Sequence, residues 1–135
     1  MSSLYMLDTD ICAFILRRAS PTLLDRIQMT PLHRQVMSVV TYAELMYGVQ
    51  LSTKKKMNQE ALDDFVRHLA IHEWTREAAS CYATIRAALR KEGAMIGAND
   101  LMIAAHAVSL GATVVTNNTK DFGRVKGLKV ENWMD

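Results

Sequence analysis

Four acidic residues stand where predicted strands or loops meet predicted helices, although long stretches of sequence separate them: Asp8, Glu44, Asp100 and Asp121. In an α/β fold with a parallel sheet, the ends of successive strands converge on one edge, so carboxylates that are dispersed in sequence can meet in one crevice. Like charges in a partly desolvated pocket repel one another by roughly a few kcal/mol per close pair, and a hard divalent cation is the usual compensation. The pattern therefore indicates an acidic, metal-binding site.

Each acid also has a local structural explanation. Glu44 follows Thr41 by three residues, which is the spacing of a capping box at a helix start. Asp100 falls in the first turn of a predicted helix, where the helix dipole favours an anion. Asp8 and Asp121 belong to a residue type that is common at helix starts and turns. We favour the shared site, because all four positions map to the same edge of the sheet.

The elements that must position these acids alternate between strands and helices. The sequence predicts strands at residues 4–7, 36–40, 70–74, 113–116 and 128–130, and helices at residues 10–18, 22–29, 41–51, 56–69, 76–92 and 100–110. Ser20, Thr75 and Asn99 are expected to cap helices, and Gly93 and Gly111 to end them. This alternation implies right-handed βαβ crossovers, and hence an α/β fold with a central parallel sheet of four to five strands covered by helices on both faces.

Length and charge limit the classes of protein that the chain can represent. Its 135 residues, 50% of them apolar, predict a single domain over residues 1–135 that buries its own core. The formal net charge of +2 excludes a histone-like mode of binding, yet gathering the acids on one edge leaves the remaining surface basic. Cations that could contact phosphates are Arg17, Arg18, Lys54, Lys55, Lys56, Arg86, Arg90 and Lys91. A solvated helix face explains any single one of them better.

Cysteine usage and the apolar segments favour a protein of the reducing cytoplasm. Cys12 and Cys81 lie in predicted helices and form no C-x-x-C pair, which argues against disulfides and thiol zinc sites. The start of the chain lacks the basic region and long apolar core of a secretory signal. The most apolar stretch, residues 94–115, is interrupted by Asn99, Asp100 and His106 and is a poor membrane span. We therefore expect no membrane association.

Four linked segments carry a family resemblance: residues 6–9 (MLDT), 38–45 (SVVTYAEL) with Gly48, 96–104 (IGANDLMIA) and 115–122 (VTNNTKDF). Together they resemble the PIN-domain ribonucleases and, more narrowly, the VapC toxins of VapBC type II toxin-antitoxin pairs. The resemblance covers essentially the whole chain, in order and with family-like spacing. One departure is Asp10, where many family members carry Asn; we interpret Asp10 as the cap of the first helix.

The resemblance implies a PIN-like three-layer α/β/α sandwich and a metal-dependent endoribonuclease. The implied catalytic and metal-binding residues are Asp8, Glu44, Asp100 and Asp121. The first three would hold Mg²⁺ or Mn²⁺ directly or through water, and the fourth would complete the site or help to hold a second ion. Such ions can activate water and relieve charge on phosphoryl oxygens. The side chains of Thr9 and Asn118 are expected to orient the carboxylates.

The resemblance also implies a reaction, a substrate and partners. Hydrolysis would leave a 5′-phosphate and a 3′-hydroxyl. VapC toxins generally form homodimers, and a VapB antitoxin lays its C-terminal segment into a groove near the site, where a basic side chain can compete with metal and RNA. The RNA targets are commonly structured, with tRNA anticodon regions prominent, and the enteric branch that looks most similar suggests initiator tRNA. The expected function is therefore that of a toxin that inhibits translation.

Two other classes of protein fit parts of the sequence. The segment Asp8-Thr9-Asp10 after an apolar strand resembles the start of a phosphatase of the haloacid dehalogenase type, in which one Asp is the nucleophile and the second the acid/base. The later catalytic lysine and the Gly-Asp-Asp-type motif of that class are not found. A noncatalytic RNA-binding domain would show no metal dependence, and the four intact acids argue against it.

The remaining candidates are weaker. His68 and His72 stand four apart, but no third zinc ligand is evident near them and the helix is expected to end between them. His33 and His106 have no nucleophile around them and are interpreted as structural. The apolar helix faces around Leu45, Met46 and Phe65 are expected mainly in the core. Grooves lined by methionine also suit a partner helix, so such a groove at these faces stays an alternative.

Overall fold

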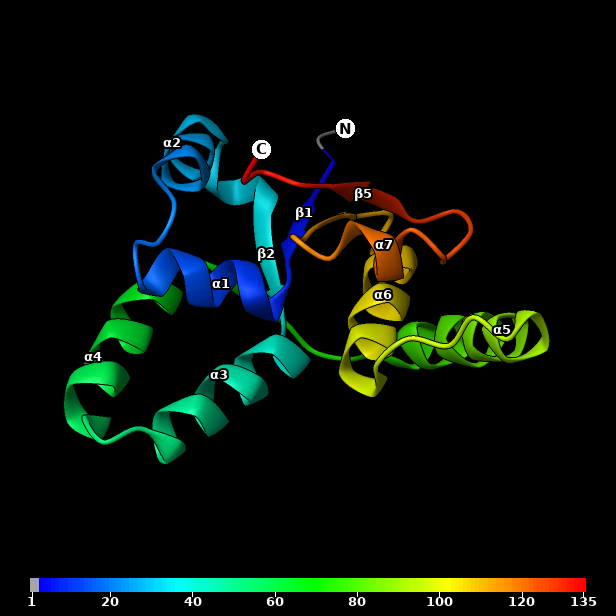
Figure 1. The fold of residues 1–135 in the computed structure, drawn as a ribbon, viewed down its shortest axis with the longest axis horizontal. Helices are drawn as coiled ribbons and strands as arrows, with labels where there is room; N and C mark the ends of the chain where they lie inside the picture. The colour runs from blue at the N-terminus through cyan, green and yellow to red at the C-terminus, as the bar shows by residue number, and fades with distance from the viewer. Residues whose placement is uncertain (1–2) are drawn as a thin grey trace.

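The computed structural model describes residues 3–135, and its centre is a five-stranded sheet in which all neighbouring strands are parallel (Figure 1). The strands are β1 (Tyr5–Leu7), β2 (Gln35–Ser38), β3 (Ala70–His72), β4 (Thr113–Val115) and β5 (Lys129–Glu131), in the spatial order β3-β2-β1-β4-β5. The chain runs outward from β1 to β3 and then returns to the other side of β1 to form β4. In α/β folds, ligand sites lie at the carboxyl ends of the strands beside such a switch.

Seven α-helices and one 3₁₀ turn (Leu32–Arg34) lie within the described residues. The helices are α1 (Thr9–Leu16), α2 (Pro21–Met29), α3 (Val39–Leu51), α4 (Lys55–Val66), α5 (Arg76–Glu92), α6 (Ala98–Leu110) and α7 (Thr119–Phe122). The strand and helix order agrees with the alternation expected from the sequence, and the predicted parallel sheet is confirmed.

Two separate cores cover the two faces of the sheet, because successive side chains of a strand point to opposite faces. Met6 and Val114 pack with buried residues of α5, α6 and α7, whereas Leu7 and Val115 pack with buried residues of α1 to α4. Figure 1 shows α1 to α4 on one side of the strands and α5 to α7 on the other. The predicted α/β/α sandwich is therefore confirmed.

Several helix boundaries follow from short-range hydrogen bonding. The Ser20 hydroxyl accepts from the Leu23 amide before α2, and the Thr75 hydroxyl accepts from the Ala78 amide before α5, so both predicted caps are confirmed. Gly93 and Gly111 end α5 and α6 with φ of 64° each, a left-handed conformation that favours glycine.

Three predicted caps are wrong. Asp8, and not Asp10, caps α1, because its carboxylate accepts from the Ile11 amide at 2.9 Å. The helix α3 begins at Val39 and is capped by Ser38, so Thr41 lies inside the helix and forms no capping box with Glu44. The helix α6 begins at Ala98, which places Asn99 in its first turn, where its side chain makes a long-range contact instead of a cap.

Other boundaries differ by a few residues. The strand β2 ends at Ser38 rather than at residue 40, and β3 ends at His72 rather than at residue 74, because helix or coil begins earlier than apolar runs alone indicate. The helix α4 ends at Val66, three residues before the prediction. The short α7 and the 3₁₀ turn were not predicted, since elements of three or four residues show no periodicity.

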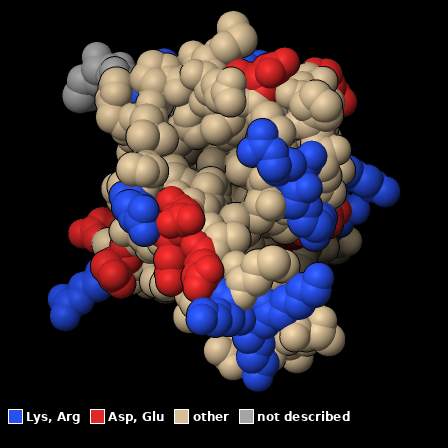
Figure 2. All heavy atoms as spheres, turned by 90° about the vertical axis from the view of Figure 1, so that its left-hand side faces the viewer, with Lys and Arg blue, Asp and Glu red and all other residues tan. Residues whose placement is uncertain are grey.

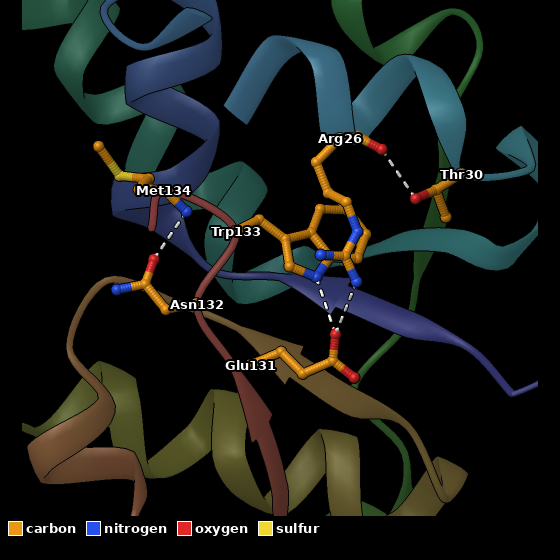
Figure 3. A network of polar contacts seen from close by, with 6 residues as sticks. All are labelled: Arg26, Thr30, Glu131, Asn132, Trp133 and Met134. Carbon is orange, nitrogen blue, oxygen red and sulfur yellow. Dashed lines mark hydrogen bonds and ion pairs between the residues drawn. The ribbon is translucent and has the colours of Figure 1, made fainter. Parts of the chain in front are cut away.

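The C-terminal segment is held against α2 by a network around Trp133 (Figure 3). Glu131 Oε1 accepts from Trp133 Nε1 at 2.9 Å and from Arg26 Nη2 at 3.3 Å, and the Arg26 guanidinium lies 5.0 Å from the Trp133 ring centroid. Asn132 Nδ2 donates to Asn117 Oδ1 at 3.2 Å in the loop after β4. The end of the chain thus anchors the loop that leads into α7 and Asp121.

No helix within residues 3–135 is long and apolar enough to cross a membrane.

Candidate active site

Asp8 lies at the carboxyl end of β1 and is the most buried of the four acids, with 3% of its surface exposed. Burial raises the pKa of Asp8 to about 7, and the charges of Asp10 and Asp100 add to the rise. The Ile11 amide and the Thr116 side chain oppose it by stabilising the ionised form. A carboxylate with this pKa gains from a bound cation that relieves its desolvation.

Glu44 lies in the second turn of α3 and is half-buried. The Thr9 hydroxyl donates to its Oε1, and Asn99 Nδ2 donates to its Oε2 at 2.9 Å. Thr9 belongs to α1 and Asn99 to α6, so residues from two other helices orient this carboxylate. Both oxygens retain lone pairs for a further ligand.

Asp100 and Asp121 lie in the first turns of α6 and α7. Burial raises the pKa of Asp100 to about 6, and the charges of Asp10, Glu44 and Asp121 raise it further, whereas the Asn118 side chain opposes the rise. Asn118 Nδ2 also donates to Asp121 Oδ2 at 3.0 Å. The charge coupling among Asp8, Asp100, Glu44 and Asp121 shows that the fold gathers all four carboxylates in one region.

Asp10 is a fifth acid at the rim of this group. Its side chain is exposed, and its charge contributes to the raised pKa values of both Asp8 and Asp100. It therefore adds negative potential to the site, although it does not cap α1.

The four carboxylates suit Mg²⁺ or Mn²⁺ if the ion keeps some of its water ligands. Within residues 3–135, no group of three or more His, Cys, Asp or Glu side chains is close enough to form a ready-made metal cage. Mg²⁺ commonly binds one or two carboxylates and keeps several waters, so a closed cage is not required. Four coupled carboxylates, two of them with raised pKa values, fit an ion that is held partly through water.

Two residues that the sequence analysis missed contact the acidic group. Asn99, interpreted there as a cap, bonds Glu44 across 55 positions of sequence. Arg124 Nη1 lies 3.9 Å from Asp121 Oδ1. The adjacency of Asn99 to Asp100 was the only sequence signal for the first, and nothing in the local sequence marked the second.

The histidines lie in different environments. His68 follows the end of α4 and His72 ends β3, so the two do not share a helix face. His106 is buried in α6, where its Nδ1 lies 2.9 Å from the Ser38 hydroxyl, and its Nε2 has no hydrogen-bond partner among the described residues. Burial lowers the pKa of His106, the charge of His72 lowers it further, and a contact with the Glu73 backbone opposes the change without reaching hydrogen-bond geometry.

The two cysteines and the apolar residues around Leu45 lie within the fold, away from any disulfide. Cys12 is buried in α1, Cys81 is half-buried in α5, and both are free thiols. Leu45 is buried in the core on the α1–α4 side, with Met46 and Phe65 packed against it.

Comparisons with known proteins show which family the chain belongs to. The model of the PIN domain family matches residues 5–128. Ribonuclease VapC2 from Rickettsia felis is 38% identical over 131 residues, covering 96% of this chain and 98% of the relative. The tRNA(fMet)-specific endonuclease VapC from Shigella flexneri is 36% identical over 129 residues, covering 96% and 97%.

Solved structures show the same fold. The DNA-bound VapBC structure from Salmonella typhimurium matches with a TM-score of 0.93 at 33% identity, covering 98% of this chain and 99% of that chain. The promoter-bound VapBC2 structure from Rickettsia felis matches with a TM-score of 0.90 at 38% identity, covering 96% and 98%. The chain belongs to the PIN-domain family and, within that family, to the VapC ribonucleases. The phosphatase interpretation of the Asp8-Thr9-Asp10 segment finds no support in these matches.

Proposed function

We propose that this ribonuclease is the toxin of a toxin-antitoxin pair. We further propose that it cleaves RNA with the help of Mg²⁺ or Mn²⁺, which would be held by the carboxylates of Asp8, Glu44, Asp100 and Asp121. The single observation that supports the metal requirement best is the electrostatics of the site. Burial and mutual repulsion raise the pKa values of Asp8 and Asp100 to about 7 and about 6. A divalent cation removes that cost and stabilises the ionised forms.

Three of the four carboxylates are held by hydrogen bonds that orient them for this role. Asp8 is fixed by the Ile11 amide, Glu44 by Thr9 and Asn99, and Asp121 by Asn118. When bound, the ion supplies an activated water and relieves charge on the phosphoryl oxygens. The protein's contribution is to orient oxygen ligands from four segments and to exclude water on the Asp8 side. We expect products with a 5′-phosphate and a 3′-hydroxyl.

The substrate that we propose is tRNA, with the anticodon region of initiator tRNA as the specific target. Two relatives at 36% and 34% identity, from Shigella flexneri and Salmonella typhimurium, are named tRNA(fMet)-specific endonucleases. We also propose a cytoplasmic location, because tRNA is found there and the two free thiols suit a reducing compartment.

The partner that we propose is a VapB-type antitoxin, because similar solved structures are VapBC complexes. A groove of about 300 Å³ between α1, α3 and α4 suits an inserted helix or extended segment. Ala13, Leu16, Leu45, Val49 and Leu62 are among the residues that line it. Figure 2 views the molecule from the α4 side, where acidic and basic side chains lie next to one another around an area without charged side chains.

The location of this groove gives inhibition a physical basis. It borders α1, which starts next to Asp8, so a segment bound there can carry a basic side chain to the carboxylates and compete with metal and RNA. We also propose a homodimer that joins with the antitoxin into a larger assembly. Sedimentation of the free chain and of a co-expressed pair tests both statements.

Cleavage assays test the proposed activity directly. Purified protein is incubated with total tRNA in EDTA, Mg²⁺ or Mn²⁺, and the RNA ends are sequenced. We expect cleavage only with metal, and Asp8→Asn, Glu44→Gln and Asp100→Asn should each lower the rate by about 100-fold or more, since each removes several kcal/mol of stabilisation. The matched control is Asp25→Asn, which changes an exposed acid on α2. Equal cleavage by the folded active-site variants, or cleavage in EDTA, would reject the proposal.

A further inference from the structure

We propose that Arg124 binds a phosphate of the RNA beside the scissile bond and orients it toward the carboxylates. This inference rests on the proposed function and adds a cationic contact to the four acids. Within residues 3–135, Arg124 is the only lysine or arginine whose side chain pairs with any of Asp8, Glu44, Asp100 and Asp121. Its Nη1 lies 3.9 Å from Asp121 Oδ1.

The backbone after α7 places Arg124 at this point. The Arg124 amide donates to the Asp121 carbonyl at 3.1 Å, and the Gly123 amide donates to the Thr119 carbonyl at 2.9 Å. A Cβ added at Gly123 would lie 2.6 Å from the Thr119 carbonyl oxygen, so the chain can turn this tightly only with glycine. The tight turn returns the Arg124 side chain to the side of Asp121.

The Arg124 guanidinium is anchored by one hydrogen bond and keeps donors that have no partner among the described residues. Nη1 donates to the Met95 carbonyl at 3.1 Å, in the segment between α5 and α6, and its distance to Asp121 is longer than a hydrogen bond. Among the described residues, Nε and Nη2 make no hydrogen bond. With 36% of the side chain exposed, these donors can be reached by a ligand while the Met95 contact limits their motion.

The chemistry of the site favours phosphate as that ligand. An RNA strand must approach a group of carboxylates that repels it, and a cation at the rim lowers this repulsion. The planar guanidinium can donate two parallel hydrogen bonds to phosphate oxygens, which a lysine cannot do. A donor fixed before the substrate arrives stabilises developing charge without reorganisation. Arg124 is therefore suited to hold the non-bridging oxygens of the strand.

A purely structural role makes the opposite prediction for metal affinity. If Arg124 only supports Asp121 and the Met95 segment, its removal should loosen the carboxylates and weaken Mg²⁺ binding. If it contacts the substrate, its removal takes away a competing cation, so Mg²⁺ should bind equally well or more tightly while cleavage falls.

The experiment compares full-length Arg124→Gln, Arg124→Lys and the control Lys126→Gln. Lys126 lies two residues further along, is 86% exposed and pairs with Glu92 rather than with the four acids. Single-turnover cleavage of tRNA, Mg²⁺ affinity by calorimetry, thermal unfolding, and tRNA binding in EDTA over a salt series are measured for each protein.

We expect Arg124→Gln to lower cleavage by about 100-fold, with Lys restoring part of the rate and Lys126→Gln within about twofold of the parent. Mg²⁺ affinity should stay equal or rise, and the salt slope of tRNA binding should fall by about 0.7 to 0.9. Undiminished cleavage and tRNA binding by Arg124→Gln overturn the inference, and so does a joint loss of stability and Mg²⁺ affinity.

Misfolding of the glutamine variant and failure of the proposed cleavage can each be told apart from failure of the Arg124 contact. If the glutamine variant does not fold, the lysine variant decides, because it keeps the charge and should lose about tenfold in rate at unchanged Mg²⁺ affinity. If the parent protein cleaves no RNA but binds tRNA through Arg124 in EDTA, the proposed metal-dependent cleavage fails and the phosphate contact stands.

Discussion

Replacing Asp8 with asparagine should stabilise the metal-free protein and abolish cleavage at the same time. The Asp8 carboxyl is 3% exposed, and its pKa is raised from 3.8 to about 7, chiefly by burial. The folded state therefore binds a proton more tightly than the unfolded state does, so stability falls as the pH rises from about 4 to about 7. The full cost above pH 7 is about 4 kcal/mol, and at pH 5 it is about 2 kcal/mol.

Asparagine removes this cost without removing the local structure. Its side-chain oxygen can still accept the Ile11 amide that begins α1, so the cap is preserved. We expect the variant to be more stable than the parent in EDTA, with a gain at pH 8 that exceeds the gain at pH 5 by about 2 kcal/mol. At pH 8 this corresponds to a rise in Tm on the order of 10 °C for a domain of this size.

The assay is urea unfolding at pH 5 and pH 8 in EDTA, repeated with Mg²⁺ and with Asp25→Asn as the control. Added Mg²⁺ should stabilise the parent and have little effect on Asp8→Asn, because the ligand carboxylate is missing. If the variant gains no stability at pH 8, or gains the same amount at both pH values, the carboxylate is not destabilising in the folded state and the electrostatic argument for the metal is refuted.

Three further changes test other parts of the structure. Gly123→Ala should cost about 1–3 kcal/mol by urea unfolding, because its Cβ would collide with the Thr119 carbonyl; unchanged stability would mean that the turn after α7 is looser than described. Because the pKa of His106 is lowered in the folded state, the unfolded chain binds a proton on this ring more tightly, and the parent loses stability as the pH falls below about 6.5. His106→Gln should therefore lose less stability than the parent between about pH 7 and pH 5 in urea unfolding. Equal losses would contradict this. Trp133→Leu should destabilise by about 3 kcal/mol in thermal unfolding through lost packing and the lost bond to Glu131 (Figure 3). Trp133→Phe loses the same bond but keeps an aromatic ring beside Arg26, so it should cost less, and equal effects would show that the contact between the ring and Arg26 adds little.

Much of the fold could be predicted because its elements are locally specified. The caps at Ser20 and Thr75 and the glycines that end α5 and α6 depend on atoms within a few residues, and the sequence identified them correctly. Strand-helix alternation then restricts the topology to a parallel sheet. The errors at Thr41 and Asn99 have one cause. Both residues fit a helix cap by local pattern, but contacts with distant segments decide what their side chains do.

The acidic residues illustrate the same division. The sequence by itself determined that Asp8, Asp100 and Asp121 stand at or near the starts of helices in an α/β fold and that Glu44 lies early in the helix after the second strand, since residue type and periodicity are local properties. Only the tertiary structure decided how far each carboxyl is desolvated and which side chains orient it. Burial and charge depend on atoms supplied by segments far apart in the chain, such as Asn99 at Glu44, and no local pattern encodes the distance between them.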